Sequence, residues 1–313
     1  MTDKQKITIG TRGSALALWQ ANWVKSELER EYPGIEVSLT VIKTKGDKIL
    51  DVPLAKVGGK GLFVKEIEDA LLNHDIDLAV HSMKDVPTEL PDGLQVAIFP
   101  AREDPRDAFF SHSGKSLKEM PEGAIIGTSS LRRIAQILNA FPHLETRDLR
   151  GNVDTRLKKL ERGEYDGIIL AYAGVKRLGW ADKVTELLDP IISLPAIAQG
   201  ALGIETRIND DFNNQRLAFF HDPKTALAVR TERALLRTLE GGCQVPIAAH
   251  ATVDENNLIS LTGLVAALDG RKIIKEIASG KEPEKLGESL ARTLLQQGAG
   301  ELLEECFAAN PDI

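Results

Sequence analysis

One of the two cysteines in this 313-residue chain follows a pair of glycines, in the stretch GGCQVPIAAHA over residues 241–251. A thiol on such a turn has little packing value, whereas Cys306 lies at helical spacing from Leu302 and Leu303 and is expected in the core. Cys243 follows the end of an expected helix, where the helix dipole disfavours a thiolate. We therefore interpret Cys243 as a permanent attachment point, alkylated once by a carbon electrophile. A buried structural cysteine is the alternative.

A carboxylate, Asp85, follows an apolar strand expected over residues 76–83. Open α/β sheets bind their ligands at the carboxyl ends of their strands, so Asp85 is placed to transfer protons or to stabilise a cation. The alternative is that it caps the turn before Pro87. His81 and Ser82 do not form a hydrolase pair, because adjacent residues on a strand point to opposite faces.

Two stretches join a strand to a helix through a short polar loop, TRGS at 11–14 and GTSSLRR at 127–133. Free N–H groups and the positive end of the helix dipole favour an anion at such a junction. Both stretches also hold a hydroxyl and an arginine, which favours a divided anion site over ordinary capping. The guanidinium fork binds carboxylates in bidentate fashion. The candidate arginines are Arg132, Arg133, Arg147, Arg150, Arg156 and Arg177. Phosphate is the competing ligand, but the chain has neither a P-loop nor a Rossmann glycine fingerprint.

Positive charge is concentrated in two segments of an acidic chain. The net charge of −7 argues against a general nucleic-acid binder. Residues 39–65 hold six lysines against two aspartates, a local +4. Residues 128–159 hold five arginines and two lysines against three acidic residues, again +4, so the rest of the chain carries −15. This partition favours a compact polyanion as the ligand, although two solvated charged faces would give the same counts.

Composition and hydropathy predict a globular cytoplasmic protein. Hydrophobic residues make up 42% of the chain and charged residues 27%, which is ordinary for a soluble protein. No apolar run approaches the roughly 18 residues that span a bilayer, and the first residues do not resemble a signal peptide. Two cysteines fit a reducing compartment. We expect no membrane, nucleic-acid or metal partner.

Strand and helix patterns alternate along the first two thirds of the chain. Strands are expected over 6–12, 35–44, 76–83 and 94–100, and helices over 15–32 and 62–72, the first of them capped by Ser14. The pattern repeats as strand, turn and helix over 124–141, a helix over 152–163, and a strand with a helical turn over 165–179. Such alternation predicts parallel, doubly wound sheets.

The pattern changes from about Thr225. A helix is expected over 225–239, followed by strands over 247–253, 258–267 and 271–279 and a last helix over 284–307. Asp254–Asn257 and Asp269–Gly270 supply the turns between the strands. These residues predict a small α+β domain with an antiparallel three-stranded sheet.

The chain resembles the porphobilinogen deaminases, also called hydroxymethylbilane synthases, from its first strand to its last helix. The motifs that carry the resemblance are TRGSALALWQ, DVPLAKVGGKGLFVKEIEDALL, DLAVHSMKDVP, AREDPRDAF, IGTSSLRRIAQI, LRGNVDTRLKKL, ILAYAGVKRLG and GGCQVPIAAHA. The resemblance implies a transferase of porphyrin and heme biosynthesis. Such an enzyme joins four porphobilinogen molecules head to tail, releases ammonia at each step and yields the linear tetrapyrrole hydroxymethylbilane.

The resemblance also implies the residues of the site. It implies a dipyrromethane cofactor, made from the substrate and joined through a thioether to Cys243, and a catalytic role for Asp85. The positions implied to bind the cofactor are Cys243, Ser82, Lys84, Asp85, Thr128, Ser130, Arg132, Arg133, Arg150 and Gly151. Those implied to bind the substrate are Arg12, Ser14, Arg150, Arg156, Arg177 and Gln199. Lys56, Lys60 and Phe63 match the active-site loop of the family.

Three domains and a monomer are implied in the same way. The first, over 1–100 and 200–218, and the second, over 105–194, resemble the doubly wound lobes of periplasmic binding proteins. The third, over 222–313, carries the cofactor cysteine. Two departures from the family pattern are Ala15, where many members have proline, and the run Ala248-Ala249-His250, where a glycine is common. They affect a helix start and the packing after the cysteine.

Two other classes of protein are compatible with parts of this sequence. A two-lobed binding module would close on an anion without catalysis, and it would have no use for Asp85 or Cys243. A cysteine-dependent hydrolase would need a histidine beside Cys243, and His250 is the nearest in sequence. Replacing Cys243 by serine separates the three classes, because only the transferase carries a covalent pyrrole on that thiol.

Overall fold

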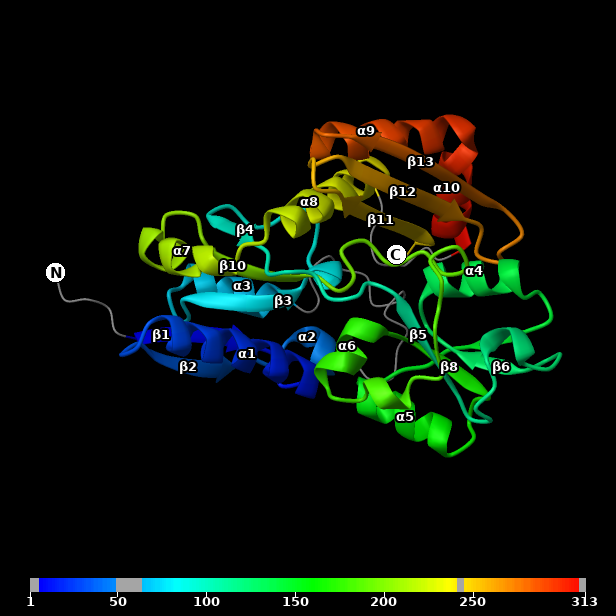
Figure 1. The fold of residues 1–313 in the computed structure, drawn as a ribbon, viewed down its shortest axis with the longest axis horizontal. Helices are drawn as coiled ribbons and strands as arrows, with labels where there is room; N and C mark the ends of the chain where they lie inside the picture. The colour runs from blue at the N-terminus through cyan, green and yellow to red at the C-terminus, as the bar shows by residue number, and fades with distance from the viewer. Residues whose placement is uncertain (1–5, 49–63, 241–244, 310–313) are drawn as a thin grey trace. The chain divides into compact units, whose positions relative to one another are not determined.

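The computed structural model describes residues 6–48, 64–240 and 245–309 (Figure 1). These residues form two compact units. The first contains the described residues up to Arg102 together with Ala201–Ala226, and the second contains Glu103–Gly200 and the residues from Leu227 onward. The expected three-domain boundaries are not tested by this division and stay a prediction. Within the described ranges, no helix is long and apolar enough to cross a membrane.

The first unit is built on a five-stranded sheet of order β2-β1-β3-β10-β4. β1 pairs in parallel with β2 and β3, whereas β10 runs antiparallel to both β3 and β4. Its elements are β1 (Lys6–Thr11), α1 (Ala15–Glu31), β2 (Glu36–Val41), α2 (Lys45–Lys48), α3 (Lys65–Leu72), β3 (Leu78–Ser82), the 3-10 helix η2 (Met83–Asp85), β4 (Leu94–Ile98), β10 (Leu202–Arg207) and α7 (Asp211–Leu217).

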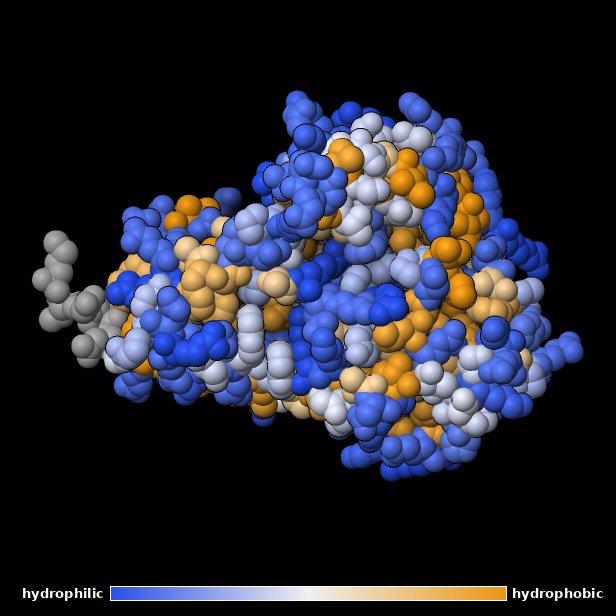
Figure 2. Space-filling model, viewed as in Figure 1, coloured by the Kyte–Doolittle hydropathy of each residue, from blue (hydrophilic) through white to orange (hydrophobic). Residues whose placement is uncertain are grey.

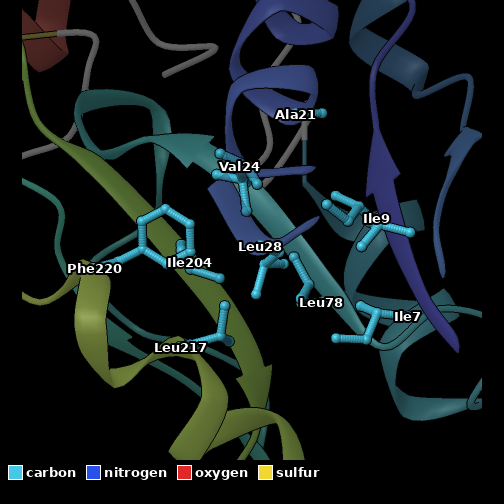
Figure 3. Packing of buried hydrophobic residues seen from close by; sticks show 11 residues of the cluster. Ile7, Ile9, Ala21, Val24, Leu28, Leu78, Ile204, Leu217 and Phe220 are labelled. Atoms are coloured by element: carbon cyan, nitrogen blue, oxygen red, sulfur yellow. The ribbon is translucent and has the colours of Figure 1, made fainter. Parts of the chain in front are cut away.

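The helix α1 begins where its sequence predicts and covers one face of this sheet. The Ser14 hydroxyl accepts a hydrogen bond from the backbone N–H of Ala17 at 3.3 Å and so caps the helix. Val24 and Leu28, one turn apart, lie among residues of the strands such as Leu78 (Figure 3). Each such fully buried side chain contributes about 1.5–3 kcal/mol of burial free energy.

The second unit contains another five-stranded sheet, of order β7-β6-β8-β5-β9, in which β5 is the antiparallel strand. The arrangement of parallel and antiparallel strands therefore matches that of the first sheet. Its elements are β5 (Asp107–Ser111), β6 (Ile125–Gly127), α4 (Leu131–Ala140), β7 (Glu145–Arg147), α5 (Val153–Glu161), β8 (Gly167–Ala171), α6 (Tyr172–Arg177) and β9 (Glu186–Leu187).

The second unit also holds the antiparallel sheet β11-β12-β13, which α9 covers in Figure 1. Its elements are β11 (Ile247–Val253), β12 (Ile259–Ala266), β13 (Ile273–Gly280), α9 (Pro283–Leu294) and α10 (Gly300–Ala309), and α8 (Pro223–Thr238) precedes them with residues in both units. The predicted fold class is thus confirmed: two α/β lobes and a small α+β part.

Two details differ from the sequence-based expectation. One strand in each five-stranded sheet is antiparallel, because β10 and β5 enter their sheets from distant parts of the chain. The single helix expected over 284–307 is interrupted over Leu295–Ala299, where Gly298 has φ 99°. A left-handed residue cannot continue an α-helix, and glycine adopts that conformation without a steric penalty.

Hydrophilic residues cover much of the face seen in Figure 2, and hydrophobic residues gather between them in several separate places.

Cys306 is 1% exposed within α10, as predicted, and burial raises the pKa of its thiol.

Candidate functional site

In the first unit, a 3-10 turn presents Asp85 at the carboxyl end of β3. The side chain of Met83 is 2% exposed and anchors this turn, and its backbone N–H donates to Ala201 at 3.0 Å. A Cβ on Gly203 would lie 2.1 Å from the Met83 sulfur, so the neighbouring strand needs glycine there. Asp85 itself is exposed. A buried anchor two residues away thus holds an accessible carboxylate at the ligand-binding edge of the sheet.

Four other predicted residues of this unit lie near the same sheet edge. β1 and β3 are parallel neighbours with Gly10 opposite Ala79, so their carboxyl ends meet. Arg12 and Ser14 follow β1, Ser82 is the last residue of β3 and Lys84 follows it, and all four are half-buried. Gln20 of α1 donates to the Ser82 hydroxyl at 2.9 Å. His81 instead binds Glu205 at 2.8 Å, which confirms that His81 and Ser82 do not pair.

In the second unit, a polar loop joins β6 to α4. Thr128 is 1% exposed, and its hydroxyl accepts from the backbone N–H of Ser130, the residue before the helix, at 3.2 Å. Ser129 donates to the Leu149 carbonyl at 2.7 Å and accepts from the Leu149 N–H at 3.1 Å. The loop between β6 and α4 is therefore held by a hydrogen bond of its own and by two hydrogen bonds to Leu149.

Two predicted arginines, Arg132 and Arg133, share one buried carboxylate. Arg132 Nη1 lies 2.8 Å from Asp107 Oδ2, and Arg133 Nη2 lies 2.7 Å from Asp107 Oδ1. Burial alone would raise the pKa of Asp107, but the two guanidinium groups outweigh it and hold that pKa far below its usual range. Burial lowers the pKa of Arg132, and Asp107 opposes this effect.

Arg150, in the loop before α5, and Arg156, within α5, have partners close in sequence. Arg150 Nε donates to Asp148 at 2.8 Å, and Arg156 Nε donates to the Gly151 carbonyl at 2.7 Å. Burial acts to raise the pKa of Asp148, but hydrogen bonds from Ser129 and Arg150 lower it overall. Gly151 has φ 109°, and a Cβ there would lie 2.7 Å from Thr155, so this position requires glycine.

Arg177 binds the residue that follows Gln199, so both predicted residues belong to the turn at Gln199 and Gly200. Arg177 Nη2 donates to the Gly200 carbonyl at 2.8 Å, and burial lowers the pKa of Arg177 to about 10. Gln199 Nε2 donates to the Pro105 carbonyl at 2.6 Å and to Asp107 at 2.9 Å. Gln199 therefore joins the network of Asp107.

A second buried carboxylate, Glu232 of α8, connects this stretch to β11. Glu232 is 0% exposed and accepts from the backbone N–H of Ala198 at 2.5 Å and of Ala251 at 2.7 Å. Ala198 has φ 57°, a strained conformation for a residue with a side chain. The His250 ring lies 3.5 Å from Glu232. Glu232 thus fixes both the Gln199 turn and the strand that follows the cysteine segment.

Cys243, Lys56, Lys60 and Phe63 lie outside the described residues. Sequence reasoning missed Asp107, Ser129 and Glu232, and also Ser193, whose hydroxyl donates to Asp107 at 2.8 Å. The motif AREDPRDAF contains Asp107 and was the only signal that could have found it. Its partners lie tens of residues further along the chain.

Fold and site define a protein with two α/β lobes that carry polar and cationic residues at their strand ends, joined to a small α+β part. Two family models match the chain: "Porphobilinogen deaminase, dipyromethane cofactor binding domain" over residues 7–215 and "Porphobilinogen deaminase, C-terminal domain" over 226–296. The chain belongs to the porphobilinogen deaminase family.

Curated porphobilinogen deaminases are similar in sequence to this chain along almost its whole length. The porphobilinogen deaminase of Geobacter sulfurreducens is 59% identical, covering 96% of this chain and 95% of the relative. That of Pelobacter propionicus is 57% identical over 97% and 98%, and that of Syntrophobacter fumaroxidans is 54% identical over 99% and 100%. Among solved structures, the methionine-binding protein MetQ aligns with a TM-score of 0.45 and 14% identity, covering 72% of this chain and 93% of that one.

Proposed function

We propose that this protein condenses four porphobilinogen molecules head to tail into hydroxymethylbilane on a covalent dipyrromethane primer. The observation that carries the proposal is the near full-length similarity to curated porphobilinogen deaminases, at 59% identity over 96% of the chain. Each condensation breaks a C–N bond and forms a C–C bond. Ammonia leaves from the aminomethyl carbon, and a proton leaves the pyrrole carbon that is attacked.

The residues of the second unit fit a cofactor that bears carboxylates. The Nε atoms of Arg132 and Arg133 are buried and have no hydrogen-bond partner among the described residues. A ligand carboxylate would satisfy such donors. When bound through Cys243, dipyrromethane supplies the pyrrole carbon to which the first porphobilinogen unit is joined.

Asp85 is proposed as the catalytic carboxylate. Its exposed position at the end of β3 leaves both oxygens available to pyrrole N–H groups. Loss of ammonia from porphobilinogen leaves a cationic carbon, and a carboxylate about 4 Å from such a charge has a Coulomb energy of about 4 kcal/mol at an effective dielectric of 20. Asp85 would therefore favour the departure of ammonia and steady the cation until it is attacked.

The remaining polar residues are proposed to bind the acetate and propionate groups. Each porphobilinogen unit brings two carboxylates, so the negative charge of the bound chain grows with every step. Ser82, Lys84, Thr128, Ser130, Arg132, Arg133, Arg150 and Gly151 are assigned to the cofactor. Arg12, Ser14, Arg150, Arg156, Arg177 and Gln199 are assigned to the substrate, with Lys56, Lys60 and Phe63 in the active-site loop.

The intact mass of the denatured protein tests the proposal. The wild type should exceed its sequence mass by two linked pyrrole units, and Cys243→Ser should show the sequence mass alone. Incubation with porphobilinogen should then release four molecules of ammonia per tetrapyrrole from the wild type only. A wild type that stays unmodified after incubation would refute the covalent primer and favour a binding module.

We further propose that the protein acts as a monomer in the cytoplasm with no macromolecular partner. The acidic net charge argues against a nucleic-acid partner, the two cysteines fit a reducing compartment, and the monomer is what the family resemblance implies. Sedimentation equilibrium at micromolar concentrations should give a single species of 34.2 kDa, and a species of twice that mass would contradict the monomer.

A further inference from the structure

Within the described ranges, the buried arginine pair of the second unit has a single carboxylate in its ion pairs. Arg132 is 4% exposed and Arg133 is 6% exposed, and both pair with Asp107, which is 0% exposed. Two guanidinium groups and one carboxylate leave one net positive charge shielded from water. Burying an unbalanced charge costs several kcal/mol, so this arrangement is favourable where a ligand supplies the second anion.

The donors of the two arginines show how much of each group is already committed. Arg132 Nη1 donates to Asp107 and to the Leu194 carbonyl, at 2.8 and 2.7 Å. Arg133 donates to Asp107 through Nη2 and to the Ile169 carbonyl through Nη1 at 3.0 Å. The Nε atom of each arginine is left without a partner in the described part of the chain. A buried N–H without an acceptor costs about 1–3 kcal/mol, so these two Nε donors favour an anion from outside the protein.

Asp107 is itself held from several sides. Ser193 Oγ donates to Oδ2 at 2.8 Å, and Gln199 Nε2 donates to Oδ1 at 2.9 Å. Asp107 begins β5 and lies opposite Ala171, the last residue of β8. It therefore lies at the sheet edge where β8 ends, which is the ligand-binding edge of such sheets. A carboxylate with this many fixed donors cannot rotate, and it fixes the planes of both guanidinium groups.

We infer that Asp107 is a positioning residue for the proposed reaction: it orients Arg132 and Arg133 and holds their net charge at one, so that a single carboxylate of the pyrrole ligand completes the site. The inference rests on the proposed function, because it assigns the missing anion to the cofactor or substrate. Asp107 acts through the arginines and does not itself contact the ligand, whose carboxylates it would repel.

The test follows covalent loading of the cysteine by mass. Protein made in cells that cannot synthesise porphobilinogen is purified without adduct, incubated with porphobilinogen, and sampled for the two-pyrrole mass increase. Asp107→Asn should load at least tenfold more slowly than the wild type at low porphobilinogen, because an amide cannot anchor both guanidinium groups. Raising the porphobilinogen concentration should restore much of the rate. A purely structural role would lower the loadable fraction, and added substrate would not recover it.

Coupling to the arginines separates positioning from a general defect. In an Arg132→Gln/Arg133→Gln background, Asp107→Asn should cause no further slowing, because the groups through which it acts are gone. Equal loading of Asp107→Asn and wild type would overturn the inference alone. Failure of the wild type to load would instead overturn the proposed function.

A milder variant keeps the inference testable if Asp107→Asn does not fold. Ser193→Ala removes one donor to Asp107 without changing any charge, and it should slow loading two- to threefold. Ser111→Ala, at the other end of β5, is the matched control and should load at the wild-type rate. Loading of Ser193→Ala at the rate of this control would also overturn the inference.

Discussion

At the scale of single residues, burial separates the carboxylates of the site into two kinds. Asp85 is exposed, so it can exchange partners during turnover at little cost. Asp107 and Glu232 are each 0% exposed and accept hydrogen bonds from fixed donors. A buried carboxylate that loses a donor is left with an uncompensated charge. Such a carboxylate is therefore suited to keep the same hydrogen bonds throughout the reaction. We therefore assign the catalytic role to the exposed Asp85. Asp107 and Glu232 hold other groups of the site in place.

Replacing Asp85 by glutamate should leave the covalent cofactor in place but lower turnover at least tenfold. The longer side chain keeps the charge and displaces it by about one methylene, which is enough to lose a close electrostatic contact. Intact mass reports the cofactor, and the rate of ammonia release reports turnover. Glu89→Gln, an exposed carboxylate of the same segment, is the control and should behave as wild type. Near-normal turnover of Asp85→Glu would remove Asp85 from the catalytic role.

Glu68 should make the stability of the first unit depend on pH. It is 6% exposed, and burial, together with nearby Glu205, raises its pKa from 4.5 to about 7. A carboxyl whose pKa rises on folding binds its proton more tightly in the folded state. The stabilisation is complete below pH 4.5 and is lost as pH rises through about 7, by about 3 kcal/mol at most.

Urea unfolding at pH 5 and pH 8.5 measures this dependence. Glu68→Gln keeps a neutral side chain at both pH values, so its free energy of unfolding should fall less than that of the wild type between them. Asp92→Asn, at an exposed position of the same unit that does not act on Glu68, should retain the wild-type slope. A Glu68→Gln slope equal to that of the wild type would show that Glu68 is ionised in the folded protein.

At the scale of elements, short turns with defined geometry set the positions of functional side chains. The 3-10 turn η2 places Asp85 beyond β3, and the positive φ of Gly151 shapes the loop that carries Arg150. Positive φ also marks the interruption between α9 and α10, where Gly298 has φ 99°. Helical periodicity continues across that break, so the sequence pattern does not reveal it.

Two glycines in this last stretch should respond oppositely to alanine. Gly298→Ala places a Cβ at φ 99° and should lower the free energy of unfolding by about 1 kcal/mol. Gly300 has helical angles, φ −58° and ψ −46°, and a Cβ there meets Leu295 at an ordinary 3.7 Å. Gly300→Ala should therefore stabilise the protein by up to about 1 kcal/mol. Chemical unfolding measures both, and destabilisation by Gly300→Ala as large as that by Gly298→Ala would contradict the argument.

At the scale of the whole molecule, charge is divided between an acidic majority and two cationic segments. Residues 39–65 and 128–159 each carry +4 in a chain of net charge −7. The carboxylates of a small substrate are attracted to the cationic segments and repelled elsewhere, which guides its approach. Salt should weaken this guidance, because the Debye length falls from about 10 Å at 0.1 M to about 3 Å at 1 M.

The value of kcat/KM for porphobilinogen should therefore fall several-fold as NaCl rises from 0.05 to 0.5 M. Neutralising Lys158 and Lys159 of α5, which have no proposed contact with the ligand, should lower the low-salt value two- to threefold and flatten the salt dependence. Ammonia release at each salt concentration provides the measurement. A kcat/KM that does not change with salt would contradict electrostatic guidance.

Local pattern in the sequence determined much of this protein. The three antiparallel strands from Ile247 to Gly280, the Ser14 cap and the burial of Cys306 follow from periodicity and capping chemistry, which act over a few residues. The motifs also identified the family. These features can be predicted from local sequence, without knowing which distant segments pack together.

Only the tertiary structure decided the contacts between distant segments. β10 inserts between β3 and β4, and it brings Glu205 to His81 across 124 positions of sequence. Asp107 reaches the arginine pair of α4 across 25 and 26 positions, and Glu232 reaches Ala198 across 34. A buried charge must find an opposite charge or a fixed donor wherever the fold supplies one, and local periodicity carries no record of that partner.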